Sequence, residues 1–327
     1  MATRNVTCTT PYTDLIYLSQ LQLLILIVTN VIIAVWILVV NIFVIYGIIK
    51  TKQLHNKSFR LIFYLSISDC CMAIIPQSFL TFILAHDVIL CQVAYASSFT
   101  ASVFTHTSLY ITCGIAFDRY LRMRYLQNYD HVVGNRRFRV LLFVILLLAM
   151  LPGFLYVVGI YFDAVNIADR IGIVLDILVG SSTFVIYLRT LRAVRSHRRN
   201  SSFRNVFVSV DKIMTKVVKR ILLAIIFIFV PYMVFFLLYV ILIGYLEGRI
   251  RSWLLFCMVL SYIFTYANSL INAIIFIFAN KKLTGLLDTL LRSDKSNASS
   301  TTSTKTMSDM RHKTKSNNTK MSEELPT

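Results

Sequence analysis

Long apolar stretches separated by short polar segments dominate the hydropathy pattern of this chain. A helix needs about 20 apolar residues to cross the hydrocarbon core of a bilayer. The stretches of sufficient length are residues 21–49, 59–84, 90–119, 139–161, 168–191, 217–244 and 252–278. The pattern therefore predicts an all-α membrane protein built as a seven-transmembrane helix bundle.

The third stretch is the least apolar, because it carries many serine and threonine residues together with His106. Polar side chains are unfavourable against lipid and are found at helix–helix contacts. We therefore expect this helix at the centre of the bundle. His106 itself is open to two interpretations, a ligand contact or a hydrogen-bonding group between helices.

The segments outside the bundle have their own patterns. Residues 1–20 precede the first stretch, which gives a seven-helix domain over 21–278. Leucines at 286, 287, 290 and 291 then form one apolar face, which predicts a short amphipathic cytoplasmic helix over 279–292. Residues 293–327 are rich in Ser, Thr, Lys and Asn, a composition typical of disorder.

Composition and charge agree with a membrane protein. The chain is 57% hydrophobic and has a mean hydropathy of +0.70, above the values of soluble domains. A net charge of +18 could indicate a nucleic-acid partner. However, the basic residues lie in the connections between apolar stretches and in the tail, so we exclude a soluble nucleic-acid-binding protein.

The basic residues also predict the orientation in the membrane. The first, third and fifth connections and the tail hold 29 of the 33 Lys and Arg residues, and the other side holds Arg4, Arg170, Arg249 and Arg251. Such asymmetry places the basic side in the cytoplasm. We therefore expect a plasma-membrane protein with an extracellular N-terminus, where Asn5 begins a glycosylation sequon.

An aspartate in the middle of the second stretch, Asp69, is the main candidate for function. A carboxylate in hydrocarbon is costly and usually marks a functional site. The alternative is a protonated carboxyl group that only joins helices. An ion pathway in a transporter or channel would also use such a residue. Asp69 and Asp176 lack the converging groups of an intramembrane enzyme, so we expect no enzymatic activity.

Several motifs resemble the rhodopsin-like (class A) G-protein-coupled receptor family. Asp118-Arg119-Tyr120 lies at the inner end of the third stretch, and the other motifs follow in the family's order. They are Asn41 with Val44, Leu65 with Asp69, Tyr187 in the fifth stretch, Phe229 with Pro231 in the sixth, and Asn272, Ala273 and Phe276 in the seventh. Phe229 replaces the family's tryptophan, and Ala273 and Phe276 replace its proline and tyrosine.

The resemblance implies a signalling mechanism. Arg119 would pair with Asp118 and with an acid at the foot of helix six, here Asp211, and hold the receptor inactive. Pro231 would be the pivot, with Phe229 packed beside it. Movement of helix six would then admit a heterotrimeric G protein. Alternatively, Asp211 only offsets the charge of a basic loop.

The resemblance also implies a sodium site and further partners. Asp69 would bind the ion within a polar network; the other members expected there are Asn41, Ser108, Asn268 and Asn272. A water-filled network without a cation is the alternative. The Ser/Thr-rich tail suggests a receptor kinase and arrestin as partners. No protein cofactor is expected.

The outer half of the bundle does not specify the extracellular ligand. Candidate contacts are Tyr95, Ser98, Tyr262 and Tyr266. The seventh stretch has no lysine for a retinal Schiff base, and Ala101 stands where amine receptors have an aspartate. The family usually links helix three to the second outer loop by a disulfide, but that loop has no cysteine here. The outside pair left is Cys8 and Cys91.

Overall fold

The computed structural model describes a helical protein. The described residues are 5–6, 15, 17–86, 88–89, 91–125, 129–162, 165–200, 234, 237–238, 241 and 248–289. The chain divides into two units, residues 1–279 and residues 280–327. In the second unit, residues 281–289 are helical and lie within the amphipathic helix expected over 279–292.

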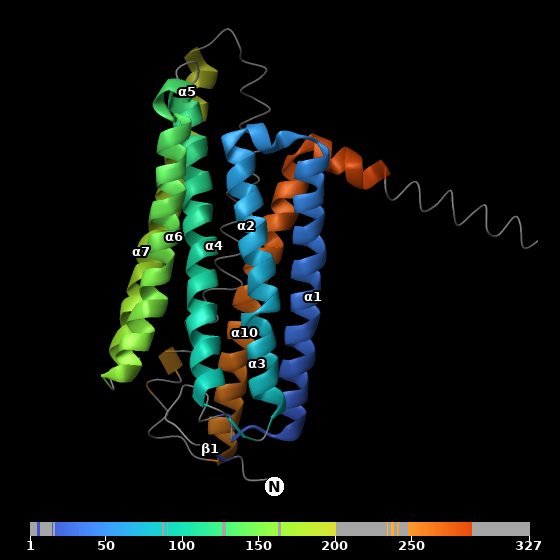
Figure 1. The fold of residues 1–327 in the computed structure, drawn as a ribbon, viewed down its shortest axis with the longest axis vertical. Coiled ribbons are helices and arrows are strands. Elements are labelled where there is room, and N and C mark those ends of the chain that lie inside the picture. The colour runs from blue at the N-terminus through green and yellow to red at the C-terminus, as the bar shows by residue number, and fades with distance from the viewer. Residues whose placement is uncertain are drawn as a thin grey trace, which may run out of the picture. The chain divides into compact units, whose positions relative to one another are not determined.

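The first unit is a bundle of long helices that run alongside one another (Figure 1). The described helices are α1 (Gln20–Lys50), α2 (Lys57–Ile74), α3 (Pro76–Ala85), α4 (Cys91–Tyr125), α5 (Tyr129–Val132), α6 (Asn135–Tyr161), α7 (Val165–Asn200) and α10 (Gly248–Ala279), with a short 3-10 helix η2 (Gln53–His55). The predicted stretch 217–244 lies mostly outside the described residues; Val234, Leu237, Leu238 and Ile241 within it are helical.

Helix α1 shows why these segments form membrane helices. It begins with a capping box, in which Gln22 N–H donates to Ser19 Oγ and Ser19 N–H donates to Gln22 Oε1. Its buried residues recur every three or four positions, whereas apolar side chains such as Trp36 on the other faces are exposed. Exposed apolar faces are what a lipid environment requires.

Four helical segments in the described part of the chain are long and apolar enough to cross a membrane. They are Gln20–Lys50, Lys57–Ala85, Asn135–Gly159 and Ile250–Ala279. Helices α4 and α7 also lie in the bundle and carry more polar residues. The helices in the described part of the chain therefore lie close to the apolar stretches that the sequence predicted.

The second predicted stretch, 59–84, lies within the membrane-span candidate Lys57–Ala85. The structure breaks it at Ile75, with α2 ending at Ile74 and α3 starting at Pro76. Proline has no backbone N–H and its ring clashes with the preceding turn, which favours a helix break at this position, although α6 continues through Pro152.

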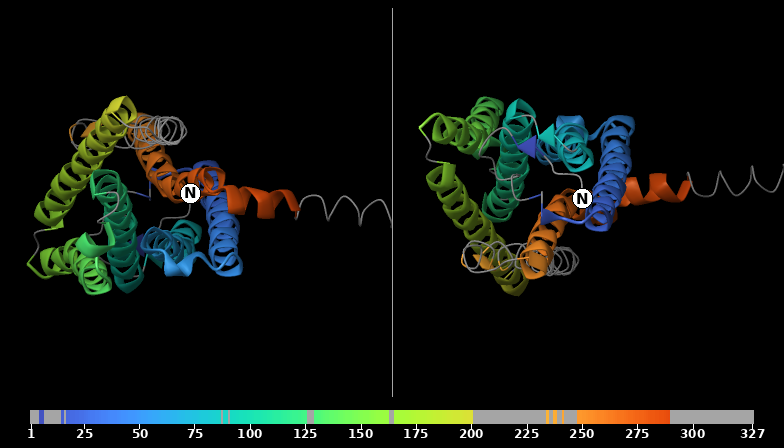
Figure 2. Two further views of the ribbon diagram at one scale, coloured as in Figure 1. Left: turned by 90° about the horizontal axis from the view of Figure 1, so that it is seen from above. Right: turned by 90° about the horizontal axis from the view of Figure 1, so that it is seen from below.

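Helix α4 lies at the centre of the bundle, as its polar composition predicted. It packs against α2 and α3 on one side and α6 and α7 on the other, and end views show it between them (Figure 2). Several of its threonines donate to carbonyls one turn earlier, for example Thr107 Oγ1 to Val103 O at 2.7 Å. The predicted end at Arg119 is wrong, because α4 continues to Tyr125.

Close packing of α4 against α6 depends on Gly153. A Cβ atom there would lie 2.8 Å from Val103 Cγ2 and 3.1 Å from the Phe99 ring. We expect Gly153→Ala to destabilise the protein by about 1–3 kcal/mol through overpacking, measured as a fall in the melting temperature of the purified protein.

The matched control is Gly180→Ala on α7, where nothing lies within 4 Å of the added Cβ. Alanine should stabilise that helix by up to about 1 kcal/mol, because glycine is a poor helix former. An equal rise in melting temperature for both variants would contradict the close α4–α6 contact.

Candidate functional site

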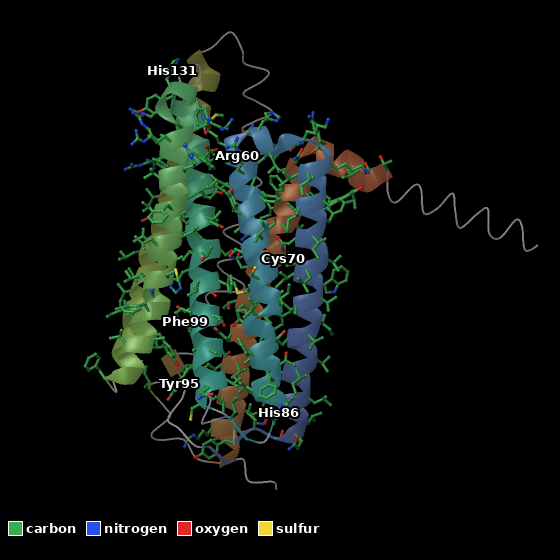
Figure 3. All side chains as sticks on the ribbon, viewed as in Figure 1. Arg60, Cys70, His86, Tyr95, Phe99 and His131 are labelled. Atoms are coloured by element: carbon green, nitrogen blue, oxygen red, sulfur yellow. The ribbon has the colours of Figure 1, made fainter. Side chains whose placement is uncertain are left out.

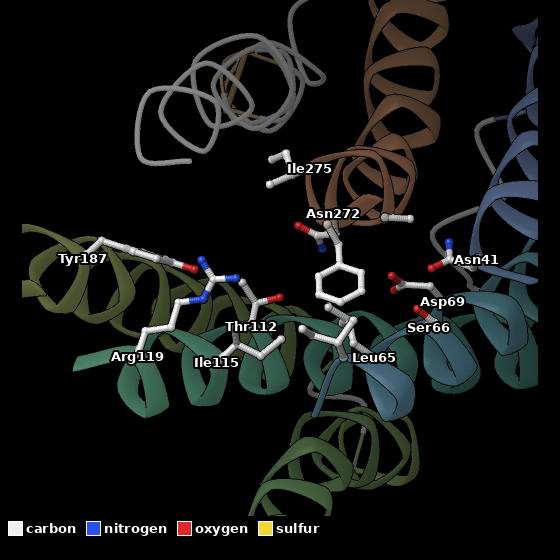
Figure 4. A pocket seen from close by; sticks show the side chains of 13 residues that line it. Asn41, Leu65, Ser66, Asp69, Thr112, Ile115, Arg119, Tyr187, Asn272 and Ile275 are labelled. Atoms are coloured by element: carbon white, nitrogen blue, oxygen red, sulfur yellow. The ribbon is translucent and has the colours of Figure 1, made fainter. Parts of the chain in front are cut away.

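A small cavity lies inside the bundle, between Asp69 and Arg119. Its volume is about 50 Å³, which is enough for a few water molecules or a hydrated ion. Its lining residues come from α1, α2, α4, α7 and α10, as Figure 4 shows. They are Asn41, Ile62, Leu65, Ser66, Asp69, Thr112, Ile115, Arg119, Tyr187, Asn272, Ala273, Ile275 and Phe276.

Asp69 forms the polar end of this cavity. Its side chain is 0% exposed, and its Oδ1 accepts a hydrogen bond from Ser269 Oγ at 2.8 Å. The second oxygen, Oδ2, has no hydrogen-bonding partner among the described residues. A buried carboxylate oxygen without a donor is costly, so this end of the cavity is suited to a cation or water.

Three of the predicted partners of Asp69 are near it. Asn41 and Asn272 line the same cavity, and the Asn272 Nδ2 group has no described partner. Ser108 on α4 approaches the carboxylate, although its hydroxyl makes no hydrogen bond within the described part of the chain. The structure thus brings Asn41, Ser108 and Asn272 to the region of Asp69, while the hydrogen bond to its carboxylate comes from Ser269.

Asn268 is not part of this network, contrary to the expectation from sequence. It is exposed, and its neighbour Ser269 is buried and donates to Asp69. Successive residues of an α-helix point about 100° apart, since there are 3.6 residues per turn. A rotation of α10 by one residue therefore decides which of the two side chains reaches Asp69.

Arg119 and Tyr187 form the other end of the cavity. Tyr187, from α7, is buried, and its hydroxyl end and the Arg119 guanidinium point toward one another (Figure 4). Tyr120, the next residue on α4, is half-buried. The structure therefore brings together two of the residues predicted to serve in coupling.

The divergent positions of α10 close the cavity with apolar groups. Phe276 is buried and its ring meets the Phe59 ring of α2 edge-on, with centroids 5.8 Å apart. Ala273 is also buried, and α10 remains helical through this region to Ala279. Because alanine replaces the family's proline, the backbone keeps its helical hydrogen bonds.

Asp118 is held by a second polar cluster at the same end of the bundle. Ser58 Oγ of α2 and the Tyr129 hydroxyl of α5 both donate to its carboxylate. Arg122, one turn further along α4, forms an ion pair with it at 3.2 Å and donates to Asn56 Oδ1 at 2.8 Å. This Asp118 cluster thereby joins α2, α4 and α5.

The ring of Tyr129 lies within cation–π distance of two cations in the Asp118 cluster. The Arg122 guanidinium is 4.3 Å and the Lys57 ammonium 5.4 Å from the ring centroid, and Lys57 Nζ also donates to the Val133 carbonyl. Burial, followed by the hydrogen bond to Asp118, raises the pKa of Tyr129 above its ordinary value. The hydroxyl therefore stays protonated and remains a donor at physiological pH.

Most of this cluster has no signature in the sequence. Arg122 could have been found, because a basic residue four positions after an aspartate on a helix is a favourable pair. Ser58, Asn56 and Tyr129 gave no such signal, since they reach Asp118 and Arg122 through tertiary packing between separate helices.

Removal of the Tyr129 hydroxyl should loosen α5. Tyr129→Phe keeps the ring beside Lys57 and Arg122 but leaves Asp118 without one donor, at a cost of about 1–3 kcal/mol. We expect faster amide hydrogen exchange in residues 129–133 and little change in α1. Tyr64→Phe, on an exposed ring of α2, is the control. Unchanged exchange in α5 would show that the hydroxyl does not hold it.

Tyr95, one of the predicted ligand contacts, lies at the opposite end of the bundle from Arg60 and His131 (Figure 3). Tyr95 and Ser98 on α4 are half-buried. On α10, Tyr266 donates to the Tyr262 hydroxyl at 2.8 Å, and their rings pack edge-to-face with centroids 5.1 Å apart. Tyr266 belongs to the buried core, whereas Tyr262 is half-buried beside it.

Other predicted site residues lie outside the described residues. They are Asp211 and the helix-six residues Phe229 and Pro231, together with Cys8. Cys91 is disulfide-bonded, whereas Cys70, Cys71, Cys113 and Cys257 are free. Asn5 belongs to a two-residue strand, β1 (Asn5–Val6), which pairs in parallel with β2 (Val88–Ile89).

The fold and this site define a class of protein. A helical bundle with apolar spans and a buried acid within one of them is a multi-pass membrane protein. Residues 40–169 match the family model of the 7 transmembrane receptor (rhodopsin family). The match supports membership of the rhodopsin-like receptor family, whose fold is the seven-transmembrane helix bundle. The comparison with curated proteins gives no match.

The matched region contains some motifs and not others. It includes Asn41, Asp69 and the triplet Asp118–Tyr120, which all lie around the cavity or the Asp118 cluster. The divergent positions Phe229, Ala273 and Phe276 lie beyond it. The match therefore rests on the first five predicted spans or their parts, where the chain keeps the family pattern.

Proposed function

We propose that this protein is a G-protein-coupled receptor that transmits the binding of an extracellular ligand to a heterotrimeric G protein. The observation that carries the proposal is one continuous cavity lined by Asp69, Arg119 and Tyr187. It connects a buried charge at mid-span with the end of α4 that bears the coupling triplet. A change at one end of the cavity can thereby alter packing at the other.

Charge supports the proposed orientation. Lys50 ends α1, Lys57 begins α2 and Arg136 lies in the first turn of α6, and Figure 3 labels Arg60 at the end of the bundle opposite Tyr95. An excess of basic residues marks the cytoplasmic side. We therefore place the Arg119 end in the cytoplasm, where a G protein, a receptor kinase and arrestin would act, and the N-terminus outside the plasma membrane.

The proposed switch is an ion pair between Arg119 and Asp211. It would hold helices three and six together, with Pro231 as the pivot for helix six. Such couplings are typically worth about 1–3 kcal/mol, which biases a two-state equilibrium about 5–150-fold. Release of the pair would free Arg119 for the G protein, and Tyr187 is positioned to meet the guanidinium beside the cavity.

We also propose that Asp69 binds a sodium ion. Alkali cations, like other hard cations, prefer oxygen ligands. The Asp69 Oδ2 atom and the Ser108 hydroxyl have no described partners, Asn41 and Asn272 are nearby, and the cavity can hold an ion with water. One carboxylate would balance the single charge of the ion. The described residues contain no cluster of three or more His, Cys, Asp or Glu side chains that would instead favour a multivalent metal.

A disulfide between Cys8 and Cys91 is part of the proposed extracellular face. Strand β1 pairs with β2 in parallel register, with Asn5 opposite Val88 and Val6 opposite Ile89. Continuation of this register by two residues would bring Cys8 opposite Cys91, which is disulfide-bonded. Glycosylation of Asn5 would occur on the same face.

The receptor proposal is tested by ligand-free coupling in cells. Basal dissociation of a panel of G proteins is compared between cells that display the protein and cells that do not, while membrane currents are recorded in parallel. We expect one G-protein class to respond and no new current. Surface protein that changes no G protein but carries an ion current would favour the alternative, a channel or transporter with Asp69 in its pathway.

A further inference from the structure

A polar cluster separate from the Asp69 cavity lies in the apolar core nearer the Tyr95 end of the bundle. It consists of Asn30 on α1 and of Gln77 and Thr81 on α3, and we refer to it as the Gln77 cluster. Asn30 is 0% and Gln77 1% exposed. None of its three residues lines the cavity between Asp69 and Arg119.

Both helices present these residues on their core faces. On α1, Asn30 falls in the buried series that includes Leu26 and Ile33. On α3, Gln77 falls in the buried series that includes Leu80 and Leu84. The spacing of three or four residues keeps each series on one side of its helix, so two amides lie within an otherwise apolar contact.

Hydrogen bonds fix the backbone side of the Gln77 cluster. Asn30 Nδ2 donates to the Gln77 carbonyl and to Thr81 Oγ1, both at 2.9 Å. Thr81 Oγ1 donates to the same carbonyl at 2.8 Å. The Asn30 amide nitrogen and the Thr81 hydroxyl are therefore already engaged.

Three atoms of the cluster remain without hydrogen-bonding partners in the described structure. They are Asn30 Oδ1 and both polar atoms of the Gln77 side chain, Oε1 and Nε2, and all three are buried. Each buried polar group without a partner costs about 1–3 kcal/mol. The cluster thus offers one donor group and two acceptors in a place that bulk water does not reach.

The apolar core around the Gln77 cluster disfavours a ligand with a charged head group. The core cluster to which these helix faces belong is built from apolar and aromatic side chains such as Leu26, Ile33, Leu80, Ile263 and Tyr266. A carboxylate or an ammonium group would lose its hydration there without gaining a counter-ion, which is strongly unfavourable. An uncharged group that both donates and accepts hydrogen bonds can pair with Asn30 Oδ1, Gln77 Oε1 and Gln77 Nε2.

We propose that the Gln77 cluster is a binding site for the uncharged amide or hydroxyl head of an apolar ligand. The head would accept from Gln77 Nε2 and donate to Asn30 Oδ1 or Gln77 Oε1, and its apolar body would pack among the surrounding core residues. This proposal is independent of G-protein coupling, because its test measures the binding of the ligand and not signalling.

The test uses a photoreactive dodecanamide and the full-length protein in lipid nanodiscs. We expect light-dependent labelling of peptides from α1 and α3. Unlabelled dodecanamide should compete at least about tenfold better than dodecanoate or dodecylamine, a difference of about 1.4 kcal/mol. Gln77→Leu should reduce the labelling at least about tenfold, whereas Gln92→Leu, the same change at an exposed position of α4, should not.

A melting curve of each variant distinguishes a loss of ligand binding from a loss of folding. Leucine removes both unpartnered polar atoms of Gln77, so the Gln77→Leu protein should melt no lower than the wild type. If it does not fold, Asn30→Leu takes its place with the same tenfold criterion. Equal competition by all three head groups, or undiminished labelling of the leucine variant, would overturn the proposal. So would absent labelling with a lower melting temperature, which would show that the cluster holds only structural water.

Discussion

Replacement of Arg119 by alanine is expected to abolish basal G-protein coupling, and replacement of Asp211 by alanine is expected to raise it. Arg119 lies beside Tyr187 at the end of the cavity and would contact the G protein directly. Asp211 would restrain Arg119 in the inactive state. Loss of a restraint worth about 1–3 kcal/mol should raise basal coupling about fivefold or more.

The measurement is ligand-free G-protein dissociation at matched surface expression. Arg124→Ala is the matched control, because it removes the same charge from an exposed position of the same helix. It should leave coupling close to the wild-type level. Coupling that survives in Arg119→Ala would contradict the proposed role of the triplet, and unchanged coupling in Asp211→Ala would contradict the restraint alone.

Asp69→Asn is expected to remove a sodium-dependent stabilisation of the purified protein. A ligand at ten times its dissociation constant stabilises a protein by about 1.4 kcal/mol. That corresponds to a rise in melting temperature of about 3–6 °C for a domain of this general size. Asparagine keeps the size of the side chain and an oxygen for the Ser269 hydroxyl, but it lacks the charge that would hold the cation.

The comparison is between melting temperatures in sodium and in potassium chloride at equal ionic strength. Asp118→Asn is the control, because it neutralises a different buried carboxylate that does not line the cavity. It should lower stability in both salts and retain the sodium response. Equal melting temperatures of the wild type in the two salts would show that the Asp69 end of the cavity holds water without a sodium ion.

The helices of this protein were predictable because the bilayer imposes them. A segment inside hydrocarbon must satisfy its own backbone hydrogen bonds, so a long apolar stretch in a membrane becomes a helix. The ranges 21–49 and 252–278 accordingly lie inside α1 and α10. Pro76 was the exception within a correctly located span, because local backbone chemistry interrupted a helix that hydropathy alone would continue.

Side-chain pairing was less predictable than helix position. Asp69 could be singled out because a mid-span charge is rare, but its donor is Ser269 and the expected Asn268 is exposed. The Asp118 cluster shows the same effect, since Tyr129 and Ser58 come from separate elements. Helix rotation, which amounts to about 100° for a shift of one residue, determines these contacts, and hydropathy does not specify it.

The sequence by itself determined the class of fold, the proposed orientation and the order of the family motifs, because hydrophobic length, charge bias and residue identity are properties of the chain. The tertiary structure alone decided that Asp69, Arg119 and Tyr187 share one cavity, that Asp118 is joined to Tyr129, and that the Gln77 amide is buried without partners among the described residues. These relations depend on the mutual rotation and depth of packed helices, which are set by close contacts between residues far apart in the chain.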